Sequence, residues 1–393
     1  MPLKPTQILA QLNNRREDFT RFDEQTTRDL EKYRTALKQA MAEPTATIQQ
    51  QLAKIADCGA RPLEPWDNFK DWIIPFGISW TTREESLAWV RDRLTGISTF
   101  AVDGSQIYPG KDLSIPVALV QIGWFENRHA NPSDYVKDID CCVMTPEDLR
   151  VERLGGDLAD RKVNLRRFQM ETERLMDYLE EHEACQDALA FFDGSFVVTF
   201  AEAMDDETRA RYVQYARNIL DTSDNFQVPV VAYIDTSTAR DMASMLQKLY
   251  HLPNNPAIHD ALLFNRIEHH KMEWGDRTPL FLCQRSGVLS QYKEQTDQVI
   301  FCYLKTNRDR YPVRLEFPLW VYQSGRMEQI LDWVRGEIAI GSGYPYVIET
   351  ADQVAVVKGE DRQAFYRIFQ EWSEQEDLNL RLSRKMVSKL RRR

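Results

Sequence analysis

The order of apolar and amphipathic runs between residues 98 and 250 constrains the fold of this 393-residue chain more than any other feature. Three runs with the character of strands come first, at 98–106, 115–127 and 137–145. A long amphipathic helix is predicted next, at 157–183. A strand, a helix, a strand and a helix should follow, at 188–197, 205–224, 228–235 and 238–250. The alternation of strands and helices indicates an α/β fold.

The short connections between the first three strands predict an antiparallel meander, and the helices between the later strands predict parallel pairing. Three antiparallel strands followed by two parallel ones is the order of a ribonuclease-H-like mixed sheet. We expect residues 1–65 to form a helical N-terminal arm and residues 66–393 to form one domain. This domain would end in an α+β C-terminal elaboration and a basic tail.

Two of the predicted strands run into the same tripeptide, Asp-Gly-Ser, at 103–105 and 193–195. In the predicted order these strands are neighbours, so Asp103 and Asp193 should lie side by side at one edge of the sheet. Adjacent carboxylates repel each other unless a cation lies between them, and Mg²⁺ or Mn²⁺ prefers such oxygen ligands. The bland alternative for each copy is a turn with an Asx cap. Asp235 ends the next strand and ranks below the other two.

A pair of such ions can hold the attacking and leaving oxygens of a phosphodiester. The helix at 157–183 should add a third carboxylate, Glu171 or Glu173. Asp260 is a further candidate, and a helix cap is at least as good an explanation for it. Further contacts with DNA are expected from three residues: Ser105, Ser195 and Arg240.

Charge and composition leave this interpretation open. The net charge is −10, yet the last thirteen residues, RLSRKMVSKLRRR, contain seven Lys or Arg and no acid. A basic tail suits phosphates or an acidic partner, and a solvated helix end explains it equally well. The six cysteines include no CxxC pair, which disfavours a zinc site. No apolar run reaches 18 residues and no signal peptide is apparent, so we expect no membrane contact and a cytoplasmic location.

Five segments in order resemble the NurA nucleases. They are AVDGSQIYPG, the helix containing RRFQMETERL, FFDGSFV, YIDTSTARDMASML and GYPYVIETADQVAVV, and the resemblance covers roughly residues 80–372. It implies a ribonuclease-H-like DNA nuclease dependent on Mn²⁺ or Mg²⁺, with two ions. Such an enzyme acts on single strands as an endonuclease and a 5′–3′ exonuclease, and on duplex ends as an exonuclease. The resemblance also implies a homodimer that works with the hexameric HerA ATPase in DNA-end processing.

The resemblance assigns the family's two strand-end aspartates to Asp103 and Asp193, and its helix glutamate to Glu171, with Glu173 as the alternative. Its late tyrosine falls on Tyr344. The family has a histidine where this chain has Asp352, in ETADQ. Aspartate is also a ligand for hard cations, so we expect Asp352 to complete the metal shell with an altered metal preference.

Two other functions compete with this one. A DNA-end or translocase-binding subunit could keep the fold and have weakened catalysis, because of the change from histidine to Asp352. An actin-like ATPase also runs strands into Asp-Gly loops, but it needs glycine-rich phosphate loops. The chain contains 16 glycines and no GxxxxGK[ST] sequence, which disfavours the ATPase.

Overall fold

The expected order of strands and helices is present in the computed structural model of the chain, which describes residues 3–69, 72–130, 134–149, 156–264, 272–381 and 383. The chain divides into two compact units. The first contains residues 1–78, 234–289 and 299–315, and the second contains residues 79–233, 290–298 and 316–393. The basic tail beyond residue 383 lies outside the described residues. The predicted division into residues 1–65 and 66–393 remains a prediction.

Five strands of the second unit follow one another in the order β4-β3-β2-β5-β6. They are β2 (Ser98–Ile107), β3 (Ala118–Asn127), β4 (Tyr135–Met144), β5 (Ala188–Asp193) and β6 (Val230–Ile234, whose last residue belongs to the first unit). As predicted, β2, β3 and β4 are antiparallel to one another. The pairs β2–β5 and β5–β6 are parallel, also as predicted. The unit is therefore a mixed α/β structure.

Burial follows the position of each strand in this order. All residues of β5 before Asp193 are buried, as an apolar strand with neighbours on both sides should be. Strand β4 ends the order, and its residues are exposed except Cys142, which is partly buried, and Met144, which is buried. The core of the second unit therefore lies around β2, β5 and β6.

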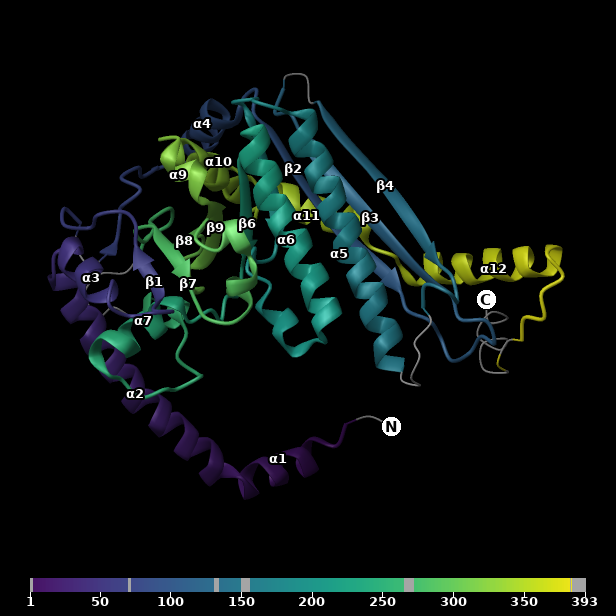
Figure 1. The fold of residues 1–393 in the computed structure, drawn as a ribbon, viewed down its shortest axis with the longest axis horizontal. Coiled ribbons are helices and arrows are strands. Elements are labelled where there is room, and N and C mark those ends of the chain that lie inside the picture. The colour runs from purple at the N-terminus through teal and green to yellow at the C-terminus, as the bar shows by residue number, and fades with distance from the viewer. Residues whose placement is uncertain are drawn as a thin grey trace. The chain divides into compact units, whose positions relative to one another are not determined.

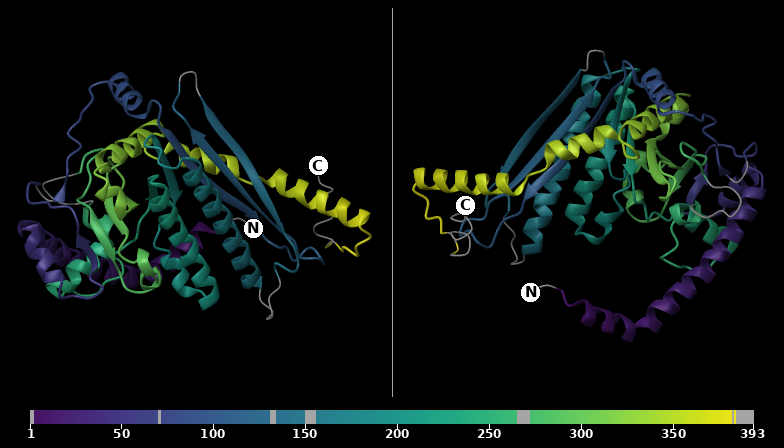
Figure 2. Two further views of the ribbon diagram at one scale, coloured as in Figure 1. Left: turned by 45° about the horizontal axis from the view of Figure 1, so that its top comes forward. Right: turned by 180° about the vertical axis from the view of Figure 1, so that it is seen from behind.

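Helices cover both faces of these strands (Figures 1 and 2). Helices α5 (Gly156–Glu181) and α6 (Asp206–Phe226) lie in front of the strands in Figure 1. The view from behind in Figure 2 shows α11 (Tyr346–Ala355) crossing the opposite face. A residue on β2 is therefore within reach of α5 from one side of the sheet and of α11 from the other.

Local signals explain where these helices begin and end. The carboxylate of Asp205 accepts a hydrogen bond from the backbone N–H of Thr208 at 2.9 Å and caps α6. Gln227 ends α6 in the left-handed conformation. Further helices of the described second unit are α4 (Arg83–Leu94), the 3-10 helices Thr199–Ala203 and Lys293–Gln295, α9 (Leu319–Gln323), α10 (Met327–Ile340) and α12 (Gly359–Gln375).

The first unit is built on the antiparallel strands β1 (Gly59–Pro62), β7 (Phe281–Gln284) and β8 (Val299–Leu304). Its helices are α1 (Pro5–Asn14), α2 (Arg16–Ala42), α3 (Thr45–Leu52), α7 (Asp241–Tyr250) and α8 (Asp260–Phe264). The sequence predicts helices in the region of α2 and α3, and the structure contains them. Strand β9 (Val313–Pro318) crosses the boundary between the units.

A buried ionic cluster fixes the start of α7 in the first unit. Asp260 accepts hydrogen bonds from the backbone N–H groups of Met242 at 3.1 Å and Ala243 at 2.8 Å. Arg314 lies 2.8 Å from Asp241 within the same cluster. Asp260 thus caps a neighbouring helix, so the structure gives it a clear structural role.

The sequence predicts one strand over 311–322, and this is wrong at its C-terminal end. Strand β9 ends at Pro318, which takes the N-cap position of α9. Proline has no N–H to donate to a neighbouring strand, and it is well tolerated where a helix begins. No helix in the described part of the chain is both long and apolar enough to cross a membrane.

Candidate active site

Asp103 and Asp193 occupy matching positions on the two neighbouring strands β2 and β5. The parallel pairing runs from Ser98 with Ala188 to Ala101 with Phe191. Each aspartate lies two residues beyond the last of these pairs. The pairing of β2 with β5 thus ends before the aspartates, while β2 continues to Ile107 in its pairing with β3. Both carboxylates therefore lie where the sheet opens between β2 and β5.

Asp103 lies close to two other acidic side chains, those of Asp193 and Asp352. Burial, the neighbouring carboxyl group of Asp352 and the charge of Asp193 raise the pKa of Asp103 to about 6. The side chain of Asp352 comes from α11 and lies within hydrogen-bonding reach of Asp103. The structure thus brings together three of the carboxylates that are predicted from the sequence.

Glu171 reaches the same place from α5, on the other side of the sheet. Burial, together with the charges of Asp103 and Asp193, raises the pKa of Glu171 to about 8, although the charge of Arg167 opposes the shift. The Oε1 atom of Glu171 is buried and accepts no hydrogen bond within the described structure. It lies 3.5 Å from Nη1 of Arg167. This unsatisfied buried oxygen is costly unless a ligand compensates it.

Tyr344 completes the group from the segment that precedes α11. Its hydroxyl group donates a hydrogen bond to Oδ1 of Asp193 at 3.3 Å. Its ring packs edge-on against the ring of Tyr233, with 5.1 Å between the centroids. The tyrosine predicted from the GYPY segment therefore contacts one of the two strand-end aspartates.

The two serines of the Asp-Gly-Ser segments both make hydrogen bonds within the protein. The hydroxyl oxygen of Ser105 accepts a hydrogen bond from the N–H of Val357 at 3.1 Å, just beyond α11. The hydroxyl group of Ser195 donates to Oε2 of Glu316 at 2.9 Å. These contacts give each serine a structural role, and their predicted contacts with DNA remain predictions.

Glu316 anchors the loop after Asp193 and is not among the residues predicted from the sequence. This fully buried glutamate on β9 also accepts a hydrogen bond from the N–H of Phe196 at 2.8 Å. The hydroxyl group of Tyr292 donates to the carbonyl of Phe196 at 2.6 Å and so holds the same loop. An acid inside the otherwise apolar run LEFPLW is the signal that identifies Glu316 as unusual.

The other selected residues lie elsewhere. The Oε1 atom of Glu173 accepts a hydrogen bond from Gln169 at 2.7 Å, and the side chain lines a different cavity, beside Trp124. Of the two helix glutamates, Glu171 is therefore the one beside the aspartates. Asp235 belongs to the first unit, where it lies 3.9 Å from Arg310. Arg240 also belongs to the first unit and donates to the carbonyl of Ile258 at 3.0 Å.

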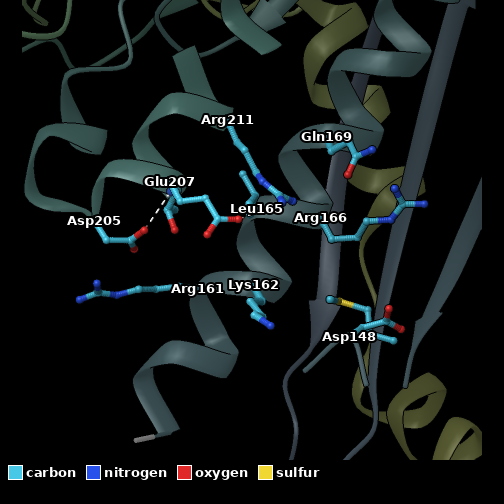
Figure 3. Close-up of a pocket in the computed structure, with 11 residues that line it drawn as sticks. Asp148, Arg161, Lys162, Leu165, Arg166, Gln169, Asp205, Glu207 and Arg211 are labelled. Carbon is cyan, nitrogen blue, oxygen red and sulfur yellow. Dashed lines mark hydrogen bonds and ion pairs between the residues drawn. The ribbon is translucent and has the colours of Figure 1, made fainter. Parts of the chain in front are cut away.

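A cavity of about 420 Å³ lies between the N-terminal parts of α5 and α6 (Figure 3). Four basic side chains line it, together with three acidic ones: Arg161, Lys162, Arg166, Arg211, Asp148, Asp205 and Glu207. Glu207 forms an ion pair with Arg211 at 3.0 Å, and the carboxylate of Asp205 caps the N-terminus of α6. The nearly balanced charge gives this cavity no clear preference for an anion or a cation.

The four gathered acids fit a divalent cation by their chemistry. All are carboxylates, which are the ligands that hard cations prefer. Their mutual repulsion and the unsatisfied oxygen of Glu171 are what a cation would relieve. Among the described residues, no three His, Cys, Asp or Glu side chains are already close enough to hold one ion, so these acids would have to rotate to share a cation.

A family model described as the NurA domain matches residues 97–357. A NurA crystal structure with manganese is 8% identical, covers 75% of this chain and 94% of that chain, and has a TM-score of 0.41. A NurA crystal structure bound to dAMP and manganese is 10% identical, covers 72% and 92%, and has a TM-score of 0.36. No curated protein matches the chain. Because the family model spans more than half of the 393 residues and includes all the gathered acids, the chain belongs to the NurA family.

Proposed function

We propose that this protein is a DNA nuclease that depends on Mn²⁺ or Mg²⁺. The observation that carries the proposal is the matched position of Asp103 and Asp193 where β2 and β5 part, with Glu171 reaching them from α5. Acids crowded in this way are unfavourable by themselves and become favourable when cations bind. Membership of the NurA family supports the same chemistry.

We assign each residue of the candidate site a role from the element that carries it. Asp103 and Asp193 would hold the ions from the two strands, while Glu171 and Asp352 would complete the shell from opposite sides of the sheet. Bound divalent ions supply charge stabilisation to a phosphodiester in its transition state. Tyr344 touches Asp193 and is placed to orient a phosphate or a base beside it. Glu316 and Ser195 keep the loop that follows Asp193 in one conformation.

We also propose a fold class, the modes of cleavage, the number of ions and the partners. The strand order β4-β3-β2-β5-β6 supports a ribonuclease-H-like class for the second unit. The remaining expectations rest on the family resemblance. For activity, they are endonuclease and 5′–3′ exonuclease action on single strands and exonuclease action on duplexes. For assembly, they are two bound ions, a homodimer and a HerA-type ATPase partner in DNA-end processing.

A second candidate is a subunit that binds DNA ends or the translocase with weakened catalysis. It is favoured by Asp352, which stands where the family has a histidine, and by the absence of a ready three-ligand group among the described residues. This candidate predicts binding of DNA without turnover.

The test is cleavage of 5′- and 3′-labelled single- and double-stranded DNA in Mn²⁺, Mg²⁺ or EDTA. Wild type should cut with metal and stop in EDTA. Asp103→Asn should lose more than the roughly 10–100-fold that changes around a metal's ligands cost, because it removes a ligand itself. Asp235→Asn is the matched control, since this strand-end aspartate lies in the first unit, and it should cut like wild type.

The label pattern gives the polarity of digestion. If wild type cuts nothing in either metal, alone or with a HerA-type ATPase, but still binds DNA ends, the second candidate replaces the nuclease. If Asp103→Asn cuts as fast as wild type, the assignment of the site is wrong.

A further inference from the structure

Arg167 is a basic side chain set among the acids of the candidate site. It lies on α5 one helical turn before Glu171, and its Nη1 atom is 3.5 Å from Oε1 of that glutamate. The same Nη1 donates a hydrogen bond to the backbone carbonyl of Gly104 at 3.0 Å, next to Asp103. The guanidinium group is thus fixed between β2 and α5.

The contacts that hold Arg167 in place do not occupy all of its hydrogen-bond donors. Its side chain remains 33% exposed, although it belongs to a site whose glutamate is almost completely buried. Its Nε atom is buried and has no hydrogen-bond partner within the described structure. The two contacts that hold it involve Nη1, so donors remain for another acceptor.

A substrate phosphodiester carries a negative charge and must approach four carboxylates. Bound cations offset part of this repulsion, and a fixed guanidinium offsets more because it keeps its charge at any working pH. Its planar donors also match phosphate oxygens in geometry. A guanidinium group that is already fixed at the site needs little reorganisation when charge develops on the phosphate.

We propose that Arg167 is a catalytic residue that donates a hydrogen bond to a non-bridging oxygen of the scissile phosphodiester. This inference rests on the proposed nuclease function and adds to it a residue that the carboxylate pattern does not contain. The competing explanation is structural: Arg167 only holds Glu171 and Gly104 together.

Arg167→Met and Arg167→Lys should be compared with wild type and with Arg91→Met, an exposed arginine on α4 of the same unit. Three quantities decide the question. They are the rate of single-strand cleavage at saturating DNA and Mn²⁺, the affinity for Mn²⁺ by electron paramagnetic resonance, and the salt dependence of single-strand binding in Ca²⁺.

We expect Arg167→Met to cut about 100-fold more slowly, the usual loss for one transition-state donor. Its slope of log affinity against log salt should be shallower by about 0.7, as expected for one lost phosphate contact on a single strand. Arg167→Lys should keep the slope and recover part of the rate. Affinity for Mn²⁺ should stay at the wild-type value, and Arg91→Met should match wild type throughout.

An unchanged salt slope overturns the phosphate contact. Loss of Mn²⁺ affinity together with activity shows instead that Arg167 only positions Glu171. If wild type cuts nothing, alone or with a HerA-type ATPase, the nuclease proposal fails, while the salt slope in Ca²⁺ still tests the phosphate contact on its own.

Discussion

Glycine follows both strand-end aspartates, and the two glycines are required for different physical reasons. Gly194 has a φ angle of +149°, in the region that side-chain-bearing residues rarely adopt. At Gly104 a glycine is required because neighbouring side chains leave no room for a Cβ atom. A Cβ atom there would lie 2.4 Å from Oε1 of Glu171 and 2.6 Å from Cγ of Arg167. The small residue thus lets α5 bring a carboxylate and a guanidinium directly onto β2.

We therefore predict that Gly104→Ala disturbs the site as well as the packing. The added methyl group has to displace Glu171 and Arg167, and such overpacking typically costs about 1–3 kcal/mol of unfolding free energy. Metal-dependent cleavage should fall with it. Urea denaturation and the cleavage assay measure the two effects.

Gly110→Ala is the matched control, because the nearest atom to its Cβ would be 3.8 Å away. It should retain the stability and activity of wild type. Wild-type stability and cleavage in Gly104→Ala would show that α5 can retreat from β2 without consequence.

The residues that could be predicted from the sequence are those that repeat a strand-end pattern. Asp103 and Asp193 share one tripeptide, and the order of elements makes their strands neighbours. The helix at 157–183 offers Glu171 and Glu173 as candidates, and the family resemblance favours Glu171. In the structure the two glutamates have different surroundings, and Glu171 is the one beside the aspartates. Arg167 is not among the predicted site residues, although it precedes Glu171 by four residues and so shares its helix face. A positive charge among acids is not part of a carboxylate pattern.

At the scale of elements, the position of α11 depends on contacts at both of its ends. The buried carboxylate of Glu337 on α10 accepts a hydrogen bond from the N–H of Val347 at 3.0 Å. At the other end, Gln121 donates to the carbonyl of Ala355 at 3.0 Å, and a Cβ at Gly123 would lie 2.6 Å from the backbone nitrogen of Ala355. These contacts fix the helix that carries Asp352 against β3.

Glu337 makes this arrangement dependent on pH through His129, whose Nε2 lies 3.1 Å from the carboxylate. Burial alone would lower the pKa of His129, but the ion pair with Glu337 and the hydrogen bond to the carbonyl of Ile97 raise it above the usual 6.5. The folded state therefore favours the charged histidine. Its contribution to stability is fully present below pH 6.5 and is lost as the pH rises through the raised pKa.

We predict that His129→Gln lowers the thermal midpoint more at pH 6 than at pH 9. The comparison is the difference between variant and wild type at each pH, so that groups titrating in both proteins cancel. His251→Asn in the first unit is the control, since asparagine tolerates the left-handed conformation that His251 adopts. A difference that stays constant across the range would mean that the ion pair does not contribute.

The elements were more predictable from the sequence than their contacts. The strand order could be inferred because short connections join the first three strands and amphipathic helices separate the later ones. The C-terminal half was harder, since α9 begins directly after Pro318 within a single apolar stretch. The buried pair of Glu337 and His129 joins residues more than two hundred positions apart, and a single sequence carries no signal for such a contact.

At the scale of the whole molecule, the proposed site couples metal binding to stability. Three acids of the site come from β2, β5 and α5, and the fourth comes from α11, so a bound cation would join elements from both faces of the sheet. A ligand that binds only the folded state stabilises it by about 2.7 kcal/mol at one hundred times its dissociation constant. Without a cation, the same acids repel one another and destabilise the fold.

These two effects predict opposite consequences for one substitution. In EDTA, Asp103→Asn should melt at a higher temperature than wild type, because it removes one of the repelling charges. In Mn²⁺, wild type should gain stability and the variant should gain little, because it has lost a ligand. Differential scanning calorimetry with and without Mn²⁺ measures both, and Asp235→Asn should respond to the metal like wild type. If Asp103→Asn melts lower than wild type in EDTA, its carboxylate makes a favourable contact that outweighs the repulsion. If it gains as much from Mn²⁺ as wild type does, the ion binds elsewhere.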